Sequence, residues 1–439
     1  MSQGVIRFIT AGSVDDGKST LIGRLLYDTK AVLADQLLAL SKTKHARVTA
    51  SDAAVDLALL TDGLEAEREQ GITIDVAYRY FATAKRKFIV ADAPGHEQYT
   101  RNLVTGASQA DVAVLLVDAT RVDLSTKPAG LLAQTKRHSA IVRLLGLRHV
   151  VVAVNKMDLL GFDENVFNAI KESVEGLATT LGLPTPHLIP VSALQGDNVV
   201  DKSDKTAWYQ GPSLLQWLEG LDTSVVHKVQ GLRFPVQYVA RQDGSAADDF
   251  RGYLGRIESG SIKKGQKVTV LPSGLEATVS EIHVSNDHQA IGDAAGVDVA
   301  KAGQVIALRL AEDVDISRGD LIVAALDSDA PTLSKQVSAD ICWLDSEPLS
   351  LARKYVLRHT TNTVFAKVKG IQQVLDVQTL SHGTDIHALN MNEIGRVDLV
   401  LQKPIVTDLF DDSPSTGAFV LIDEATNHTV AAGMVRAAS

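Results

Sequence analysis

Four short polar segments in the amino-terminal part of the chain carry residue types that together can bind a nucleoside triphosphate and its metal ion. In chain order they are Gly12–Ser19 (GSVDDGKS), Gly71–Asp75 (GITID), Asp92–His96 (DAPGH) and Asn155–Asp158 (NKMD). Each segment offers different chemical groups: backbone N–H groups with a lysine, a threonine hydroxyl, an aspartate beside a histidine, and an amide beside a carboxylate. One triphosphate site needs all of these groups, so their joint occurrence favours such a site.

The first segment has the spacing of a phosphate-binding loop. Gly12 and Gly17 bracket a turn whose N–H groups can point at phosphate oxygens, because glycine reaches unusual dihedral angles and allows close approach. Lys18 is expected to bind the β- and γ-phosphates, and the Ser19 hydroxyl to bind Mg²⁺. The predicted contact set of this loop is Gly12, Ser13, Val14, Asp15, Asp16, Gly17, Lys18, Ser19 and Thr20. Asp15 is considered for a monovalent cation, with a plain turn aspartate as the alternative.

The second and third segments supply the groups expected around the metal ion and the γ-phosphate. Ser19, Thr73 and Asp92 are the predicted Mg²⁺ ligands, and Gly95 is expected to turn its N–H toward the γ-phosphate. His96 is the candidate for orienting the attacking water, the alternative being a loop histidine that only packs. The predicted catalytic residues are His96, Lys18, Thr73 and Gly95, and the predicted nucleotide contacts of the third segment are Asp92, Ala93, Pro94, Gly95 and His96.

The fourth segment is expected to read the base. The Asp158 carboxylate can accept hydrogen bonds from guanine N1–H and from the exocyclic amino group, donors that adenine does not offer in that arrangement. Asn155 would tie this loop to the phosphate-binding loop, and the stem of Lys156 would cover the base. The predicted base-side set is Asn155, Lys156, Met157, Asp158, Ser192, Ala193 and Leu194. GTP and Mg²⁺ are therefore the predicted ligands.

The elements that must position these segments can be predicted from hydrophobic patterning. Apolar β-branched runs alternate with helical stretches up to about residue 222, which predicts an α/β domain with a mostly parallel sheet. Each motif follows one of these strands or lies between two, where open α/β sheets bind ligands. Short strands interrupted by glycines come next, and they predict β-barrels. The predicted domains are a P-loop GTPase domain at 1–222 and β-barrels at 228–326 and 332–439.

Composition narrows the classes of function. The net charge of −10 over 439 residues argues against broad binding of nucleic acid. The longest apolar runs are far shorter than the ~20 residues that cross a bilayer, so no membrane partner is expected. A single cysteine, Cys342, and a start without an apolar leader favour a cytoplasmic location.

Beyond these motifs, the chain resembles the translation-factor class of GTPases, the class of elongation factor Tu, over nearly its whole length. The resemblance outside the first domain is carried by Phe250–Val270, Asp315–Asp320 and Thr429–Val435. Two features depart from that class: Ser13 and Asp16 replace histidines of its phosphate-binding loop, and Tyr27–Arg68 is longer than its lead into the switch. These departures indicate a specialised branch.

Gly12–Asp28 and Pro94–Asn102 are similar to the GTPase-subunit family of bacterial sulfate adenylyltransferases. The resemblance implies a heterodimer or larger assembly in which a separate small subunit binds ATP and sulfate. GTP hydrolysis on this chain would drive that subunit to form adenosine 5′-phosphosulfate and pyrophosphate. Because the sequence ends at Ser439 and contains one P-loop, no adenylylsulfate kinase activity is expected.

Two alternatives share the nucleotide motifs. A translation elongation or release GTPase would bind RNA, which the acidic total disfavours. A GTP-gated scaffold would use hydrolysis only to time the release of a partner. The switch segments, the Tyr27–Arg68 insert and one barrel face are the expected contacts of the partner subunit.

Overall fold

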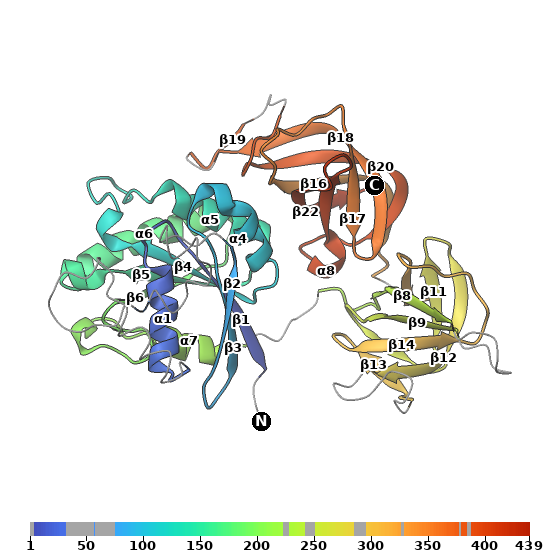
Figure 1. Cartoon of the computed structure of the whole chain (residues 1–439), viewed down its shortest axis with the longest axis horizontal. Coiled ribbons are helices and arrows are strands. Elements are labelled where there is room, and N and C mark those ends of the chain that lie inside the picture. The colour runs from blue at the N-terminus through green and yellow to red at the C-terminus, as the bar shows by residue number, and fades with distance from the viewer. Residues whose placement is uncertain are drawn as a thin grey trace. The chain divides into compact units, whose positions relative to one another are not determined.

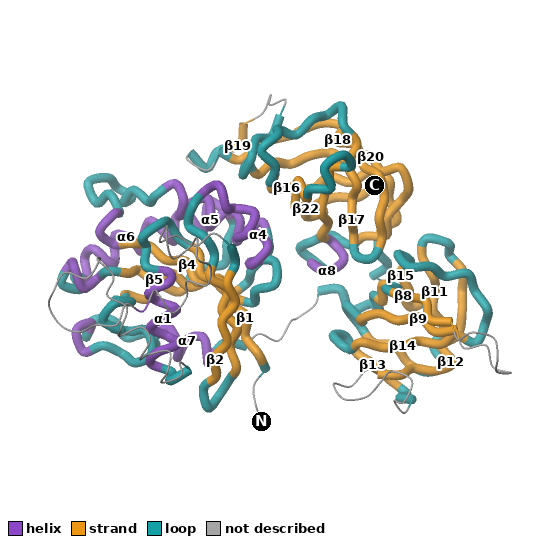
Figure 2. The backbone as a smooth tube through the Cα atoms, in the orientation of Figure 1, coloured by secondary structure: helices purple, strands orange, loops and turns teal. Residues whose placement is uncertain are grey.

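The computed structural model describes residues 4–31, 57, 75–222, 228–241, 251–284, 296–325, 329–376, 379–383 and 388–439. The chain divides into two compact units, Met1–Ser224 with Asp376–Ser381, and Val225–Leu375 with His382–Ser439. Figure 1 labels their helices and strands, and Figure 2 shows that helix is concentrated in the first unit whereas strands build the second. Within the described ranges, no helix is long and apolar enough to cross a membrane.

The first unit contains a six-stranded sheet and the helices that cover it. Its strands are β1 (Val5–Ala11), β2 (Ala77–Ala82), β3 (Lys87–Asp92), β4 (Val112–Asp118), β5 (His149–Asn155) and β6 (His187–Pro190). Its α-helices are α1 (Lys18–Asp28), α4 (Thr100–Ala107), α5 (Ala133–Leu144), α6 (Glu164–Leu181) and α7 (Leu214–Gly220). Its 3₁₀ helices are η2 (Glu97–Tyr99), η3 (Ala119–Arg121), η4 (Met157–Leu160) and η5 (Asp204–Thr206).

The strand order is β2-β3-β1-β4-β5-β6, and only the pairing of β2 with β3 is antiparallel. Strand β4 is buried along its whole length, as expected for a parallel strand covered by helices on both faces. The carboxyl ends of the parallel strands meet at one edge of the sheet. The loops after β1, β3, β4, β5 and β6 therefore lie at that edge, and they contain the motifs Gly12–Ser19, Asp92–His96 and Asn155–Asp158. Residues 71–74 of the remaining motif lie outside the described residues.

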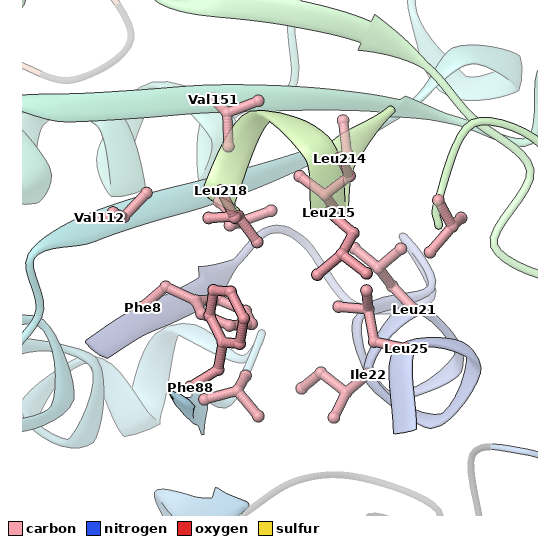
Figure 3. Close-up of a cluster of buried hydrophobic side chains, with 14 of the residues drawn as sticks. Phe8, Leu21, Ile22, Leu25, Phe88, Val112, Val151, Leu214, Leu215 and Leu218 are labelled. Atoms are coloured by element: carbon pink, nitrogen blue, oxygen red, sulfur yellow. The ribbon is translucent and has the colours of Figure 1, made fainter. Parts of the chain in front are cut away.

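One face of the sheet packs against α1 and α7. Figure 3 shows side chains of four strands directed toward leucine and isoleucine side chains of the two helices. The labelled residues are Phe8, Phe88, Val112 and Val151 from the sheet, and Leu21, Ile22, Leu25, Leu214, Leu215 and Leu218 from the helices. Ser213 is the N-cap of α7 and forms a capping box with Gln216. Helix α4 contacts β1 and β3, and α5 contacts β4 and α6.

The second unit consists of two strand-rich bodies. The first contains β7 (Phe234–Pro235), β8 (Tyr238–Arg241), β9 (Arg251–Arg256), β10 (Ser261–Lys263), β11 (Lys267–Leu271), β12 (Leu275–Val284), β13 (Val299–Lys301), β14 (Val305–Leu310) and β15 (Leu321–Ala324). Seven of these form the sheet β7-β15-β11-β12-β14-β9-β8. The sheet begins and ends on β7 and β8, which follow each other closely in the chain, so it curls back on itself.

The second strand-rich body is a closed barrel. It contains β16 (Thr332–Trp343), β17 (Lys354–His359), β18 (Asn362–Leu375), β19 (His382–Gly383), β20 (Ile394–Thr407), the short helix α8 (Pro414–Gly417), β21 (Ala418–Asp423) and β22 (Thr429–Ala438). The order β17-β21-β22-β16-β20-β18 closes because β18 also pairs with β17. The predicted fold class, an α/β domain with a mostly parallel sheet followed by β-barrels, is confirmed.

Candidate nucleotide-binding site

The loop between β1 and α1 has the conformation that its glycines permit. Gly17 has φ 92° and Asp15 has φ 64°, both in the left-handed region. A Cβ on Gly17 would come within 2.4 Å of Asn155 Nδ2, so that position has no room for a side chain. Helix α1 begins directly afterwards at Lys18 and has no side-chain cap. Its first backbone N–H groups are therefore oriented to bind an anion.

The side chain of Lys18 is enclosed by the phosphate-binding loop. Its Nζ donates hydrogen bonds to the carbonyl oxygens of Gly12, at 3.1 Å, and Ser13, at 2.7 Å. Burial lowers the pKa of the Lys18 ammonium, and the carboxylate of Asp92 is the strongest opposing influence. The ammonium group is thus held at the phosphate-binding loop by two of its carbonyl oxygens.

The metal side of the site is formed by Asp92, the last residue of β3. Its Oδ2 accepts a hydrogen bond from Ser19 Oγ at 3.2 Å, and its Oδ1 accepts one from Thr10 Oγ1 at 3.2 Å. Two of the three predicted Mg²⁺ ligands therefore lie together, whereas Thr73 lies outside the described residues. A hydroxyl and one carboxylate are hard oxygen donors that fit Mg²⁺, which usually takes its remaining ligands from phosphates and water. No group of three or more His, Cys, Asp or Glu side chains with metal-binding geometry occurs in the described part of the chain.

Gly95 packs directly against the phosphate-binding loop. A Cβ added there would lie 2.6 Å from Lys18 Nζ and 2.9 Å from Val14 N. The Gly95 carbonyl oxygen accepts a hydrogen bond from Gln134 Nε2 of α5 at 3.1 Å. His96 follows, half-buried, with its ring edge-on to Tyr99 at a centroid distance of 6.4 Å. The structure therefore brings the predicted γ-phosphate contact and the predicted water-orienting residue to the same end of the loop.

Asn155 joins the phosphate side to the base side. Its Nδ2 donates to the carbonyl oxygen of Asp16 at 2.7 Å, and its Oδ1 accepts from the N–H of Ala193 at 2.9 Å. The side chain is buried at the carboxyl end of β5. One amide thus fixes the phosphate-binding loop relative to the loop after β6.

The remaining base-side residues surround Asn155. Lys156 has φ 61°, and its Nζ lies 2.7 Å from Asp118 Oδ2. Met157 is buried, and Asp158 is half-buried with Gln195 Nε2 at 3.5 Å from its Oδ2. Burial acts to raise the pKa of the Asp118 carboxyl, but hydrogen bonds from Lys156 and Thr120 outweigh it and lower that pKa.

The other predicted contact residues lie in the same loops. Ser192, Ala193, Ala93 and Pro94 are buried, Ser13 and Asp16 are buried within the phosphate loop, and Asp15 and Leu194 are exposed. Val14 and Thr20 are half-buried. Arg24 of α1 donates hydrogen bonds to the carbonyl oxygens of Ala193 and Leu194, which ties α1 to this loop.

Four residues at the site were not predicted from the sequence: Thr10, Asp118, Arg121 and Gln134. Asp118 is the last residue of β4 and Arg121 follows the strand, so they carry the same signal as the predicted motifs, polar side chains at the end of a buried strand. Gln134 lies in the first turn of α5, and nothing in the sequence around it predicts contact with Gly95. Arg121 donates from Nη1 to the Val14 carbonyl oxygen at 2.7 Å.

Family models and known proteins match this chain over most of its length. Residues 3–231 match the family model described as elongation factor Tu GTP binding domain, and residues 336–436 match the model described as GTP-eEF1A C-terminal domain-like. A protein of Shewanella oneidensis named sulfate adenylyltransferase subunit 1 is 49% identical over 437 residues, which cover 99% of this chain and 85% of that protein. The protein of the same name from Alteromonas mediterranea is 46% identical, covering 98% and 86%. A protein of Mycobacterium tuberculosis named bifunctional enzyme CysN/CysC is 49% identical, covering 98% of this chain and 67% of that protein.

Proposed function

The chain belongs to the sulfate adenylyltransferase subunit 1 family of elongation factor Tu-type GTPases, and we propose that its GTP hydrolysis drives a partner subunit. That partner binds ATP and sulfate and forms adenosine 5′-phosphosulfate and pyrophosphate. The family name itself implies a heteromeric enzyme. Formation of the anhydride product is driven only if the GTP and GDP states of this chain act differently on the partner.

The observation that carries the proposal is the pair of hydrogen bonds made by Asn155. They hold the Asp16 carbonyl at 2.7 Å and the Ala193 N–H at 2.9 Å. The phosphate-binding loop and the base-side loop are thereby fixed relative to each other, as a site that binds both ends of one nucleotide requires. Asp158 follows in the same motif, and its carboxylate supplies the preference for guanine.

The chain's own residues take defined roles toward GTP. Lys18 and the N–H groups at the start of α1 bind the phosphates. Gly95, which packs against Val14 and Lys18, senses the γ-phosphate through its N–H. His96 orients the attacking water by hydrogen bonding, a role that depends on placement.

Mg²⁺ is the proposed metal, and Ser19, Asp92 and Thr73 would hold it. When bound, it neutralises charge on the β- and γ-phosphate oxygens. A monovalent cation near the exposed Asp15 is a further part of the proposal, tested by replacing K⁺ with choline in hydrolysis assays.

The proposal also covers the architecture and the partner surface. It retains three domains, 1–222, 228–326 and 332–439, and a cytoplasmic location. The Tyr27–Arg68 insert, the switch segments and one barrel face are the proposed contacts of the small subunit. Full coupling after replacement of that insert by a short linker would contradict the assignment of the insert.

Calorimetry on Asp158→Asn tests the base assignment. Hydrogen bonds to charged groups are worth about 1.5–3 kcal/mol, so the variant should bind GDP at least about tenfold more weakly. Asp163→Asn is the matched control, because Asp163 caps α6 by accepting from Asn165 N and asparagine caps equally well. Equal affinity of the parent chain for ADP and GDP would refute the guanine assignment.

Co-purification with the small subunit tests the coupling. Sulfate-dependent release of pyrophosphate should rise when GTP is added and should not rise with a non-hydrolysable analogue. Equal stimulation by the analogue would show that hydrolysis only times partner release. Nucleotide-dependent binding of charged tRNA would instead favour a translation factor.

A further inference from the structure

A buried carboxylate lies inside the proposed phosphate-binding loop, where a triphosphate would bring several more negative charges. The Asp16 side chain has no solvent exposure, and its Oδ2 accepts a hydrogen bond from the N–H of Ser13 at 2.5 Å. Its Oδ1 is buried and has no hydrogen-bond partner among the described residues. Burial raises the pKa of this carboxyl to about 6, with Lys18 as the strongest opposing influence. The loop therefore contains a group that would repel phosphate unless a cation offsets it.

Arg121 is placed to offset this charge. It ends η3, just after β4, and its Nη1 lies 3.7 Å from Asp16 Oδ1. The same Nη1 donates to the carbonyl oxygen of Val14 at 2.7 Å. Val14 belongs to the loop, and its N–H faces Gly95, where an added Cβ would lie 2.9 Å from it. One guanidinium thus holds the loop backbone at the proposed γ-phosphate end and faces the buried carboxylate.

The other charged groups that act on Asp16 are less suited to this task. Lys18, from α1, is the cation assigned to the phosphates. Asp118, from the end of β4, is itself negative, and its Oδ2 lies 2.7 Å from Lys156 Nζ. Once Lys18 turns to the phosphates, Arg121 is the cation that remains beside Asp16 among the residues that the structure describes. Its side chain is 42% exposed, so it can adjust as the ligand enters.

We propose that Arg121 is a positioning residue of the nucleotide site, which neutralises Asp16 and holds the Val14 carbonyl so that the loop accepts a polyphosphate. The inference rests on the nucleotide site proposed above and adds a residue to it. Arg121 acts through Asp16 and the loop, without contact with the nucleotide. Its effect on affinity must therefore depend on whether residue 16 carries a charge.

A double-mutant cycle on the full chain tests this dependence. Equilibrium binding of a fluorescent GDP and of a non-hydrolysable GTP analogue is measured for Arg121→Gln, Asp16→Asn and the double variant. Arg121→Gln should weaken binding about tenfold, about 1.4 kcal/mol. In the Asp16→Asn background the same change should cost less than about threefold, because no buried charge remains to be offset. Arg121→Lys should recover part of the affinity.

Several outcomes would overturn the inference. Equal losses in both backgrounds would mean that Arg121 acts on the ligand directly or only on the Val14 carbonyl. An unchanged affinity of Arg121→Gln would remove any role. Lys85→Gln is the control. Lys85 lies just before the amino end of β3, away from the edge that carries the motifs, and its Nζ is 2.8 Å from Glu219 Oε2. Its loss should leave nucleotide affinity unchanged. Failure of the parent chain to bind guanine nucleotides would refute the proposed function instead, and the two failures are distinguishable.

Discussion

Replacement of Asn155 by alanine tests whether this residue contributes to nucleotide binding or only to the stability of the fold. The Asn155 amide is buried and makes two hydrogen bonds, to Asp16 O at 2.7 Å and from Ala193 N at 2.9 Å. Alanine removes both bonds and adds no charge. The two loops would then lose their direct connection while the strand that ends at residue 155 remains.

The magnitude follows from those two bonds. A neutral hydrogen bond contributes about 1 kcal/mol net, and a buried group left without a partner costs about 1–3 kcal/mol. With one carbonyl and one N–H affected, the free energy of unfolding should fall by about 2–4 kcal/mol. The loops must also be ordered when the nucleotide binds, so the dissociation constant for GDP should rise at least about tenfold, the equivalent of about 1.4 kcal/mol.

Asn198→Ala is the matched control for this experiment. Asn198 is equally buried, donates to Pro190 O and Thr206 Oγ1 and accepts from Ser203 N, and none of these three hydrogen-bond partners belongs to the predicted site. Urea unfolding should show a loss of stability in both variants, at least as large in Asn198→Ala because Asn198 makes three side-chain hydrogen bonds and has φ 57°. Calorimetry should show a loss of GDP affinity only in Asn155→Ala. If the two variants bound GDP equally well, Asn155 would serve stability alone and the reasoning about loop spacing would be wrong.

Three further changes test other parts of the chain. His96→Ala should slow single-turnover GTP hydrolysis by about 10²–10⁴-fold and leave GDP affinity within about threefold; an unchanged rate would exclude the water-orienting role. Arg233→Met should lower the free energy of unfolding by about 3–5 kcal/mol, because it strips Asp408 of a buried bidentate partner with both bonds at 2.9 Å; a neutral result in urea unfolding would contradict this. His138 is fully buried, and burial lowers its pKa to about 3. In the unfolded chain the His138 imidazole binds a proton below about pH 6.5, whereas in the folded chain it stays neutral. The stabilising contribution of neutral His138 is therefore present above pH 6.5 and is lost as pH falls, by about 2 kcal/mol between pH 7 and 5. His138→Leu should lack this component, and an identical pH dependence of both chains would refute it.

The site residues predicted from the sequence lie within short segments, at adjacent or nearly adjacent positions. Gly12 to Ser19 form one turn and the start of one helix, so their chemistry can be recognised from adjacent positions. The predicted tie from Asn155 to the phosphate-binding loop agrees with the observed hydrogen bond to Asp16. Thr73 lies outside the described residues, and its role as a metal ligand stays a prediction.

The site residues that were not predicted from the sequence make contacts that only the topology of the fold explains. Arg121 and Val14 are 107 positions apart, and Gln134 and Gly95 are 39 apart. No spacing rule links such pairs. Arg121 and Val14 meet because β1 pairs with β4 in parallel, with Ala11 opposite Leu115, so that the loops after both strands emerge side by side. Gly95 follows β3, which pairs with β1 on its other side, and Gln134 reaches it from α5. Strand order therefore has to be known before these contacts can be predicted.

Strand order also explains how one nucleotide can be held at both ends without a long binding segment. Neighbouring strands in a sheet are spaced about 4.8 Å apart, so the loops after β1, β4 and β5 begin at fixed intervals along one edge. Asn155, from β5, crosses the position of β4 to reach the loop after β1. Arg121, from the segment after β4, reaches the same loop from its own position in the order. The phosphate-binding loop is thus held by side chains from two neighbouring strand ends, and a change in either contact must alter nucleotide affinity even though neither side chain is assigned to touch the phosphates.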